Sequence, residues 1–530
     1  NVLAGESATF SGPGSINNVI SRVTGGTSDI TGLKASIIDG PVSLTIPGAN
    51  FYFINPNGII FGAYGSIDAT GSVYLGTADV VRFADGSNFY ADPAKSSVLT
   101  TADPVAFGFL SDNPAAIELE GPWLGNPYTP SPVPPGKTFA LMAGDIDIRA
   151  GAFGGTAIIA PGATVSLASV SSVGDVAVDG GAADLSGFAT LGHIRLSGVS
   201  FIDVSDYDGT TGAGSIYIRG GQLTLSPAGL LAQTYDGDAS GVIDIAVRGD
   251  LVAEDPGIGF ISLIGTDIVN LPYGAGPSIN LEVGGTLRMS EGSSIVSASY
   301  IPGKAGDINI HAGTVEVQGR AGEFTGISAE NYGVATGSSL TITTGSLKVL
   351  NGGVVGTKNF GGGTGGNLSI EADSVLATGT GAKTLSLSSE TVGGQAGNLT
   401  LHTRTLELRD GARISSSTDG FGDAGSLDVV ATQQISIDGD ISGLFSATAA
   451  TDAVVGDAGN AGALNITTPL LLVNGGVIDS TTIGDGDAGA VEVRVGDLQL
   501  TGGAQIRSFS GGFDLFTGEL VVGSGAAGSV

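Results

Sequence analysis

The chain has 530 residues, of which 91 are glycine and none is cysteine. Its formal net charge of −31 argues against a nucleic-acid partner, because counterion release requires clustered lysine and arginine. Frequent glycine disfavours a helical protein, since each glycine inside a helix costs about 1 kcal/mol relative to alanine. The absence of cysteine excludes disulfides and thiolate metal sites, and no apolar run reaches the roughly 18 residues of a transmembrane segment. The composition therefore predicts an all-β protein of short strands and tight turns.

Residues 51–62 read FYFINPNGIIFG and predict two strands joined by a tight turn. Pro56 fixes φ in that turn, the side chains of Asn55 and Asn57 can bond its backbone, and Gly58 permits a positive φ. Taken alone, this segment is an ordinary turn. Five other segments make the pattern more specific: Ile20–Gly26 (ISRVTGG), Asp29–Gly32 (DITG), Phe83–Gly86 (FADG), Phe107–Leu110 (FGFL) and Gly162–Val170.

Together these segments resemble the secretion domain of two-partner-secretion exoproteins, the filamentous haemagglutinin family, over about residues 1–175. The resemblance implies a right-handed parallel β-helix that is exported through a Gram-negative outer-membrane transporter. It also implies that Asn55–Ile59 (NPNGI) helps the transporter recognise the chain, and it places Arg22 among the secretion-motif residues. The family's upstream NPNL motif is absent. We expect the extreme N-terminus of the domain to lie before Asn1.

A proline-rich segment, Gly121–Gly136, interrupts the strand pattern of this first part and contains Trp123 and Tyr128. We interpret it as an irregular flap that covers one side of the β-helix. The alternative is an aromatic platform for carbohydrate.

From Gly214 onward one phrase recurs: a small residue, glycine, a polar residue and then alternating apolar residues, as in KAGDINI at Lys304–Ile310. Between Gly214 and Gly528 it recurs at intervals of 27–39 residues, with a mean near 31. A fixed phrase with variable spacing is typical of a solenoid whose loops differ in length.

Each repeat predicts three short strands. The first carries an inward apolar pair such as Ile308 and Ile310, and the second, which follows after a short turn, carries Val315 and Val317 on either side of an outward Glu316. We expect Ile308, Leu368, Leu399 and Leu427 to stack in one inward ladder. In the third strand a serine follows an apolar residue, and we interpret these serines as stacked hydroxyls rather than a ligand-binding ladder. The repeats predict a parallel β-helix with three strands per coil of about 31 residues and roughly 17 coils. Residues 176–530 form its passenger region, which we expect to continue beyond residue 530.

Acidic residues cluster beside glycine in the predicted loops. We interpret them as solvated turn residues, with weak calcium binding as the alternative. Catalysis would require carboxylates that converge with basic groups, which are sparse nearby. We therefore assign no catalytic residue, no metal ligand and no cofactor. The acidic residues are Asp203, Asp206, Asp208, Asp236, Asp238, Asp419, Asp423, Asp485 and Asp487.

These patterns indicate a secreted, non-enzymatic cell-surface exoprotein of a Gram-negative bacterium, with an adhesive or a structural, fibre- or matrix-forming role. One alternative is a polysaccharide-active β-helix lyase or hydrolase, in which three or more acidic and basic side chains would converge in a groove. A haemolysin-type passenger is the other. The expected partners are the transporter, a carbohydrate or surface ligand, and further copies joined end to end or laterally. The long connections Ser442–Gly462 and Phe509–Gly528 are the first candidates for partner contacts.

Overall fold

The computed structural model describes residues 1–530 except 24–34, 122, 125–130, 152–154, 236–240, 255–261, 269–275, 301–302, 321–322, 381–383, 392–393, 419–421, 450–458, 484, 514–519 and 522–523. The described residues form strands and no helix, and the chain winds as a parallel β-solenoid of about 14 turns spaced about 30 residues apart. The predicted parallel β-helix is therefore confirmed. The chain divides into an N-terminal unit, Asn1–Ile264 with Leu281–Gly285, and a C-terminal unit, Gly265–Asn280 with Thr286–Val530.

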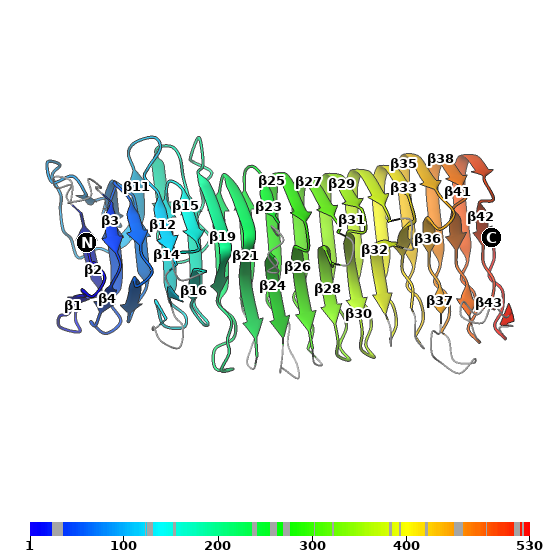
Figure 1. Cartoon of the computed structure of the whole chain (residues 1–530), viewed down its shortest axis with the longest axis horizontal. Helices are drawn as coiled ribbons and strands as arrows, with labels where there is room; N and C mark the ends of the chain where they lie inside the picture. The colour runs from blue at the N-terminus through cyan, green and yellow to red at the C-terminus, as the bar shows by residue number, and fades with distance from the viewer. Residues whose placement is uncertain are drawn as a thin grey trace. The chain divides into compact units, whose positions relative to one another are not determined.

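Three ladders of parallel strands form the N-terminal unit (Figure 1). The first ladder contains β2 (Asn18–Arg22), β5 (Asn50–Ile54), β8 (Val73–Gly76), β14 (Thr138–Ala143), β17 (Thr164–Ser169), β20 (Ser215–Gly220) and β22 (Val242–Val247). The second contains β3 (Ser36–Ile38), β6 (Ile59–Phe61), β12 (Ile117–Glu120), β15 (Ile146–Arg149), the first parts of β19 (His193–Asp203) and β21 (Gln222–Thr234), and β23 (Leu251–Ala253). The third side contains β1 (Ala8–Phe10), β4 (Pro41–Leu44), β7 (Ser66–Ala69), β13 (Trp123–Leu124), β16 (Ala157–Ile159) and the second parts of β19 and β21.

The interior of the coils is built from apolar residues at every second strand position. Ile59 and Phe61 of β6 lie beside Ile117 and Leu119 of β12, and all four are 0% exposed. A single coil cannot bury its apolar face, so each coil depends on its neighbours for a continuous core.

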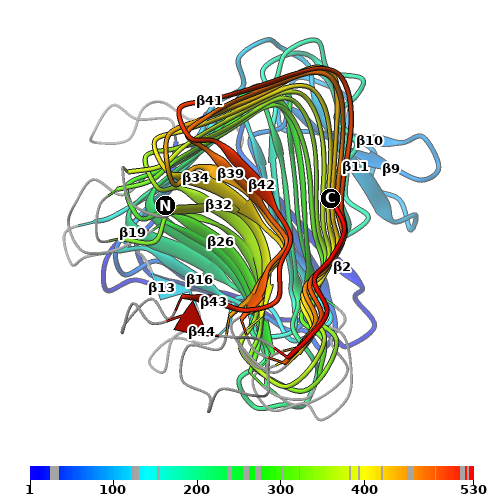
Figure 2. The ribbon, with the colours of Figure 1, turned by 90° about the vertical axis from the view of Figure 1, so that its right-hand side faces the viewer.

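A small antiparallel sheet packs against the outward side of the first ladder. Its strand order is β10 (Asn88–Tyr90), β9 (Val80–Phe83), β11 (Pro104–Phe109) and β18 (Gly174–Ala177), and β9–β11 stand beside the coils in Figure 2. The prediction of roughly 17 coils is too high, because it counted every residue of the chain in a coil. The residues between β8 and β12 instead contribute three strands to this sheet, and those between β17 and β19 contribute the fourth. The core beneath the sheet includes Tyr52, Tyr74, Ala140, Met142 and Ala168 from the ladder and Val81, Phe107, Phe109, Val176 and Phe188 from the added segments.

The C-terminal unit alternates long and short strands. The long strands are β27 (Ile308–Gln318), β29 (Leu340–Leu350), β31 (Leu368–Thr378), β33 (Leu399–Arg409), β35 (Leu427–Asp438), β38 (Leu464–Asn474) and β41 (Val491–Thr501). The short strands are β26 (Ser294–Ser299), β28 (Gly326–Asn331), β30 (Val354–Asn359), β32 (Thr384–Thr391), β34 (Ala412–Ser415), β36 (Gly443–Phe445), β39 (Val477–Asp479) and β42 (Gln505–Arg507). The remaining strands are β37 (Thr448–Ala449), β40 (Thr482–Ile483), β43 (Gly512–Phe513) and β44 (Leu520–Val521), together with β24 (Leu263–Ile268) and β25 (Ser278–Ser290), whose residues are divided between the units.

Each long strand runs along two sides of its coil, so the predicted first and second strands are one strand with a bend. In β29 the bend lies near Thr344, whose hydroxyl donates to the carbonyl of Ser346 (3.2 Å). Figure 2 shows this corner in the coils up to β41, with β32, β34, β39 and β42 on the third side. The three-sided coil is confirmed, although its first corner is a bent strand and not a turn.

The predicted inward ladder is confirmed. Ile308, Leu340, Leu368, Leu399 and Leu427 are neighbours in the strand register, and none is more than 1% exposed. Most outward positions between the apolar residues carry polar side chains, as predicted, whereas Leu376 and Leu472 are apolar.

The glycine of the repeated phrase lies where two coils touch. The Ser416 hydroxyl donates to the carbonyl of Gly397 (2.7 Å), and a Cβ on Gly397 would lie 1.9 Å from the carbonyl oxygen of Gly366 in the preceding coil. Buried hydroxyls of the third side therefore fix the corner that opens a coil. The equivalent bonds are Ser297 to Gly306, Thr357 to Gly366, Ser446 to Gly425, Ser480 to Gly462 and Ser508 to Gly489.

Candidate functional site

The NPNG segment forms the tight corner that joins β5 to β6. The N–H of Asn55 donates to the carbonyl of Gly76, and the carbonyl of Asn55 accepts the N–H of Gly58, each at 3.0 Å. Gly58 has a φ of +112°, which favours glycine, and Ile59 begins β6 with 0% exposure. A Cβ on Gly58 would also lie 3.3 Å from the carbonyl oxygen of Ala116. The turn predicted at this segment is confirmed.

The two asparagines of the motif have different environments. Asn55 is 0% exposed, and its Nδ2 donates to the Ser36 hydroxyl (2.9 Å). Its Oδ1 accepts the backbone N–H of Asn57 (3.0 Å) and the Nδ2 of Asn57 (3.1 Å). A buried amide with these bonds shapes the corner from inside. Asn57 is exposed and Pro56 is partly exposed, so these two side chains form the outer surface of the motif.

Arg22 lies beside this corner, because β2 pairs with β5 so that Arg22 neighbours Ile54. Its guanidinium donates to the carbonyl of Tyr90 (2.5 Å) and to the Ser97 hydroxyl (3.2 Å), and it lies 4.5 Å from the centroid of the Phe89 ring. Arg22 therefore links the first coil to β10 and its following loop. The rest of its motif, residues 24–26, and the segment Asp29–Gly32 lie outside the described residues.

The other segments that carry the family resemblance meet in one core. Phe83, Phe107, Phe109, Ala168 and Val170 are at most 4% exposed and all belong to the cluster beneath the antiparallel sheet. Sequence reasoning treated these segments separately and missed the sheet, because its strand pairs are distant in sequence. The available signal was the apolar side chains at outward positions of the first ladder, such as Tyr52 and Tyr74, whose rings stack with centroids 4.9 Å apart.

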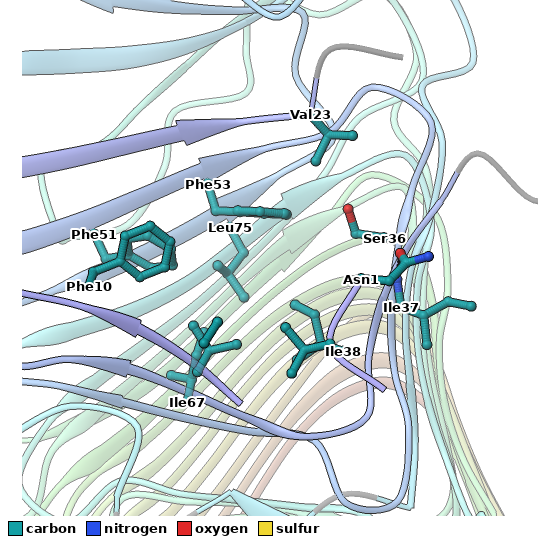
Figure 3. Close-up of a pocket in the computed structure, with 13 residues that line it drawn as sticks. Asn1, Phe10, Val23, Ser36, Ile37, Ile38, Phe51, Phe53, Ile67 and Leu75 are labelled. Atoms are coloured by element: carbon teal, nitrogen blue, oxygen red, sulfur yellow. Dashed lines mark hydrogen bonds between the residues drawn. The ribbon is translucent and has the colours of Figure 1, made fainter. Parts of the chain in front are cut away.

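A hollow of about 100 Å³ lies inside the first coils, next to the corner (Figure 3). Phe51, Phe53 and Leu75 line it on one side and Ile38 on another, and Ser36, which binds Asn55, stands at its edge. Ligand sites are usually about 300–1,000 Å³. We interpret this hollow as a packing feature of the interior.

The acidic turn residues bind backbone amides. Asp206, 1% exposed, accepts the N–H of Gly212 (2.7 Å). The hydroxyl of Thr210, together with its N–H, donates to Asp208 and lowers the pKa of that carboxyl. Asp203 is buried like Asp206. The prediction that both are solvated turn residues is therefore wrong.

In the C-terminal unit, Asp423 accepts the N–H of Asn460 (2.8 Å), and Asp487 accepts that of Ala526 (2.7 Å). These carboxylates join successive coils, and Asp485 accepts the hydroxyl of Ser524 (2.6 Å). Asp236, Asp238 and Asp419 lie outside the described residues. Within the described parts of the chain, no three His, Asp or Glu side chains are grouped to hold a metal ion.

One group of charged side chains converges in the N-terminal unit. Arg149 of β15 bonds Glu118 (2.6 Å) and Glu120 of β12 and Asp147 of its own strand (2.7 Å). These side chains are 24–43% exposed and point outward from two adjacent strands. Since all three carboxylates bind the same guanidinium, we interpret the group as an ion-pair network that ties two coils together.

The proline-rich segment contributes one short strand. Trp123 and Leu124 form β13, which pairs with β16, whereas Tyr128 lies outside the described residues. The long connections 442–462 and 509–528 are described only in part, so their predicted role in partner contacts stays a prediction.

No helix among the described residues has the length and apolarity needed to span a membrane.

The comparisons with known proteins agree with the geometry of the N-terminal unit. No curated protein and no solved structure matches the chain. The model of the TPS secretion domain matches residues 1–229, whereas our predicted boundary at residue 175 stays a prediction. Residues 1–229 are thus a TPS secretion domain, the filamentous haemagglutinin N-terminal secretion domain, and the chain is a β-helical exoprotein that two-partner secretion exports across the outer membrane through a TpsB transporter.

Proposed function

We propose that the transporter contacts the outer surface of the corner between β5 and β6, chiefly the side chains of Pro56 and Asn57. The support is the contrast in exposure within the motif. Asn55, Gly58 and Ile59 are buried and set the backbone path, whereas Asn57 is exposed. Arg22 contributes indirectly, by joining the neighbouring strand to β10.

After export, we propose, the coils serve an adhesive or structural role at the cell surface and carry out no catalysis. Exoproteins of this family are typically non-enzymatic. A regular solenoid also suits this role, because its stacked coils hold outward side chains at fixed spacing on a rigid scaffold. Cells that lack the chain should lose surface attachment or extracellular matrix. Unchanged attachment and matrix would contradict this role.

Single alanine variants at the two asparagines test the contact with the transporter. Asn57→Ala keeps the bond from the backbone N–H of residue 57 to Asn55, so its free energy of unfolding should change by no more than about 0.5 kcal/mol. Its secretion should nevertheless fall severalfold. Asn55→Ala removes a buried bonding group and should lower the free energy of unfolding by about 1–3 kcal/mol.

Secreted and cell-retained protein would be compared by immunoblot, and the stability of purified chain by denaturant unfolding. Asn17→Ala is the matched control, because Asn17 is an exposed asparagine of the same unit outside the motif. Normal secretion of Asn57→Ala would exclude the exposed asparagine as a transporter contact.

A further inference from the structure

A polar groove crosses the second side of four successive coils in the C-terminal unit. It has a volume of about 490 Å³, within the range of about 300–1,000 Å³ that ligand sites occupy. Strands β33, β35, β38 and β41 each contribute two outward side chains. In strand order these pairs are Glu407 and Arg409, Ser436 and Asp438, Leu472 and Asn474, and Gln499 and Thr501.

The groove exists because one outward side chain is small. The strand register places Ser436 between Glu407 and Leu472, so the row of outward side chains dips at the serine. Beneath it, Ile437 and Val473 are 1% exposed and belong to the core, which gives the groove a rigid floor.

Hydrogen bonds between neighbouring strands, and one within β33, hold the walls in place. Asn474 donates from Nδ2 to Asp438 (2.8 Å) and accepts the hydroxyl of Thr501 (3.3 Å). The Nε of Arg409 donates to Oε1 of Glu407 (2.6 Å). Side chains fixed in this way lose little conformational entropy when a ligand binds.

The remaining bonding capacity of the groove includes both acceptors and donors, because Arg409 directs only two of its five N–H groups to Glu407. Among the described residues, Oε2 of Glu407, Oδ2 of Asp438 and Oε1 of Gln499 have no hydrogen-bond partner. The Ser436 hydroxyl is also unpaired there, and it can accept or donate. A ligand rich in hydroxyl groups, which both donate and accept, can bond these acceptors and the remaining N–H groups together. With two carboxylates and one guanidinium lining the groove, a polyanionic ligand would be repelled.

We propose that this groove binds a linear neutral glycan. Parallel strands lie about 4.8 Å apart, close to the length of one sugar residue, so each coil offers one pair of side chains per sugar. The Leu472 side chain supplies an apolar surface against which the C–H groups of a sugar ring can pack. This inference deepens the adhesive role proposed above, on which it rests, by assigning that role a site and a class of ligand.

Calorimetric titration of the purified full chain tests the proposal. The probes are the hexasaccharides of β-1,4-glucan, β-1,4-mannan and β-1,3-glucan, with polygalacturonate as the acidic probe and Ca²⁺ alone as the ion probe. Ser436→Tyr fills the dip and should weaken binding of a neutral glycan by about tenfold or more. Ser369→Tyr is the matched control, because Ser369 is an outward serine on the other side of the long strand β31.

Binding of a neutral glycan that weakens with Ser436→Tyr but not with Ser369→Tyr would support the groove. Equal weakening by both variants, no effect of Ser436→Tyr, binding of polygalacturonate or Ca²⁺ only, or no binding of any probe would each overturn it. The adhesive role is measured separately, by attachment of cells that display the chain. Attachment that survives Ser436→Tyr would leave that role in place while removing this site from it.

Discussion

The two units use the outward side of the same ladder differently. In the N-terminal unit this side carries Tyr52, Tyr74 and Met142, which are at most 6% exposed beneath the antiparallel sheet. In the C-terminal unit the corresponding row contains Thr341, Ser369 and Thr400, which are neighbours in the register, and no strand of the described residues covers them. The difference teaches that the inward ladder alone makes a coil, whereas outward residues decide whether another layer is added.

This comparison separates a recognition region from a scaffold. The corner between β5 and β6 lies next to the covered face, and Arg22 connects the two. The coils of the C-terminal unit instead repeat one arrangement. Their inward apolar residues pack in ladders, and the glycine at each corner contacts the backbone of a neighbouring coil. Three substitutions test this division.

The largest effect is expected at a glycine corner of the C-terminal unit. A Cβ on Gly397 would lie 1.9 Å from the carbonyl oxygen of Gly366, so two backbones would have to separate. Gly397→Ala should lower the free energy of unfolding by more than about 4 kcal/mol, measured by urea denaturation followed by circular dichroism.

Gly362→Ala is the matched control, because its Cβ would meet nothing within 4 Å. It should change the free energy of unfolding by no more than about 0.5 kcal/mol. A stable Gly397→Ala variant would show that the repeated glycine does not mark a contact between coils.

A smaller effect is expected from the core beneath the antiparallel sheet. Phe107 is 0% exposed, and its ring centroid lies 6.4 Å from that of Tyr52. Phe107→Ala should lower the free energy of unfolding by about 3–5 kcal/mol and expose residues 84–103 to limited proteolysis.

The matched aromatic of the C-terminal unit is Phe360, 42% exposed and stacked on Tyr332 at 4.6 Å. Phe360→Ala should cost only about 0.5–1.5 kcal/mol, the usual worth of an aromatic pair. Equal costs for the two phenylalanines would contradict the covered face of the N-terminal unit.

The smallest effect is expected from His193. Burial, followed by the positive charge of Arg195, lowers the pKa of His193 below its usual 6.5. The folded chain therefore binds fewer protons than the unfolded chain, so stability is lost as the pH falls below 6.5. His193 is partly exposed, which keeps this loss small.

Replacing His193 with Gln should flatten the pH dependence of the unfolding midpoint, measured on both sides of pH 6.5. His402→Gln, at an exposed histidine of the C-terminal unit, controls for the loss of a histidine. An unchanged slope in His193→Gln would mean that other groups cause the pH dependence.

The sequence by itself determined the coil. Inward pairs such as Ile308 and Ile310 are spaced by two residues within one strand. The recurring glycine phrase, which contains Gly397 in one of its copies, marks the corner that opens a coil. Both signals are local in sequence. The family resemblance likewise came from short segments, and the NPNG turn follows from Asn55, Pro56, Asn57 and Gly58, which are adjacent in sequence. Local signals of this kind depend on the chemistry of adjacent residues, which a sequence shows directly.

Only the tertiary structure decided which residues meet across long separations. Phe107 packs with Tyr52, Asn55 binds Ser36, and Ser416 bonds Gly397, and none of these partners lies next to the other in sequence. The groove at Ser436 likewise depends on the register of four strands. Asn55 and Asn57 have identical side chains, yet Asn55 is buried and Asn57 is exposed. The neighbouring coil decides this difference, and its position depends on how the stacked strands pack.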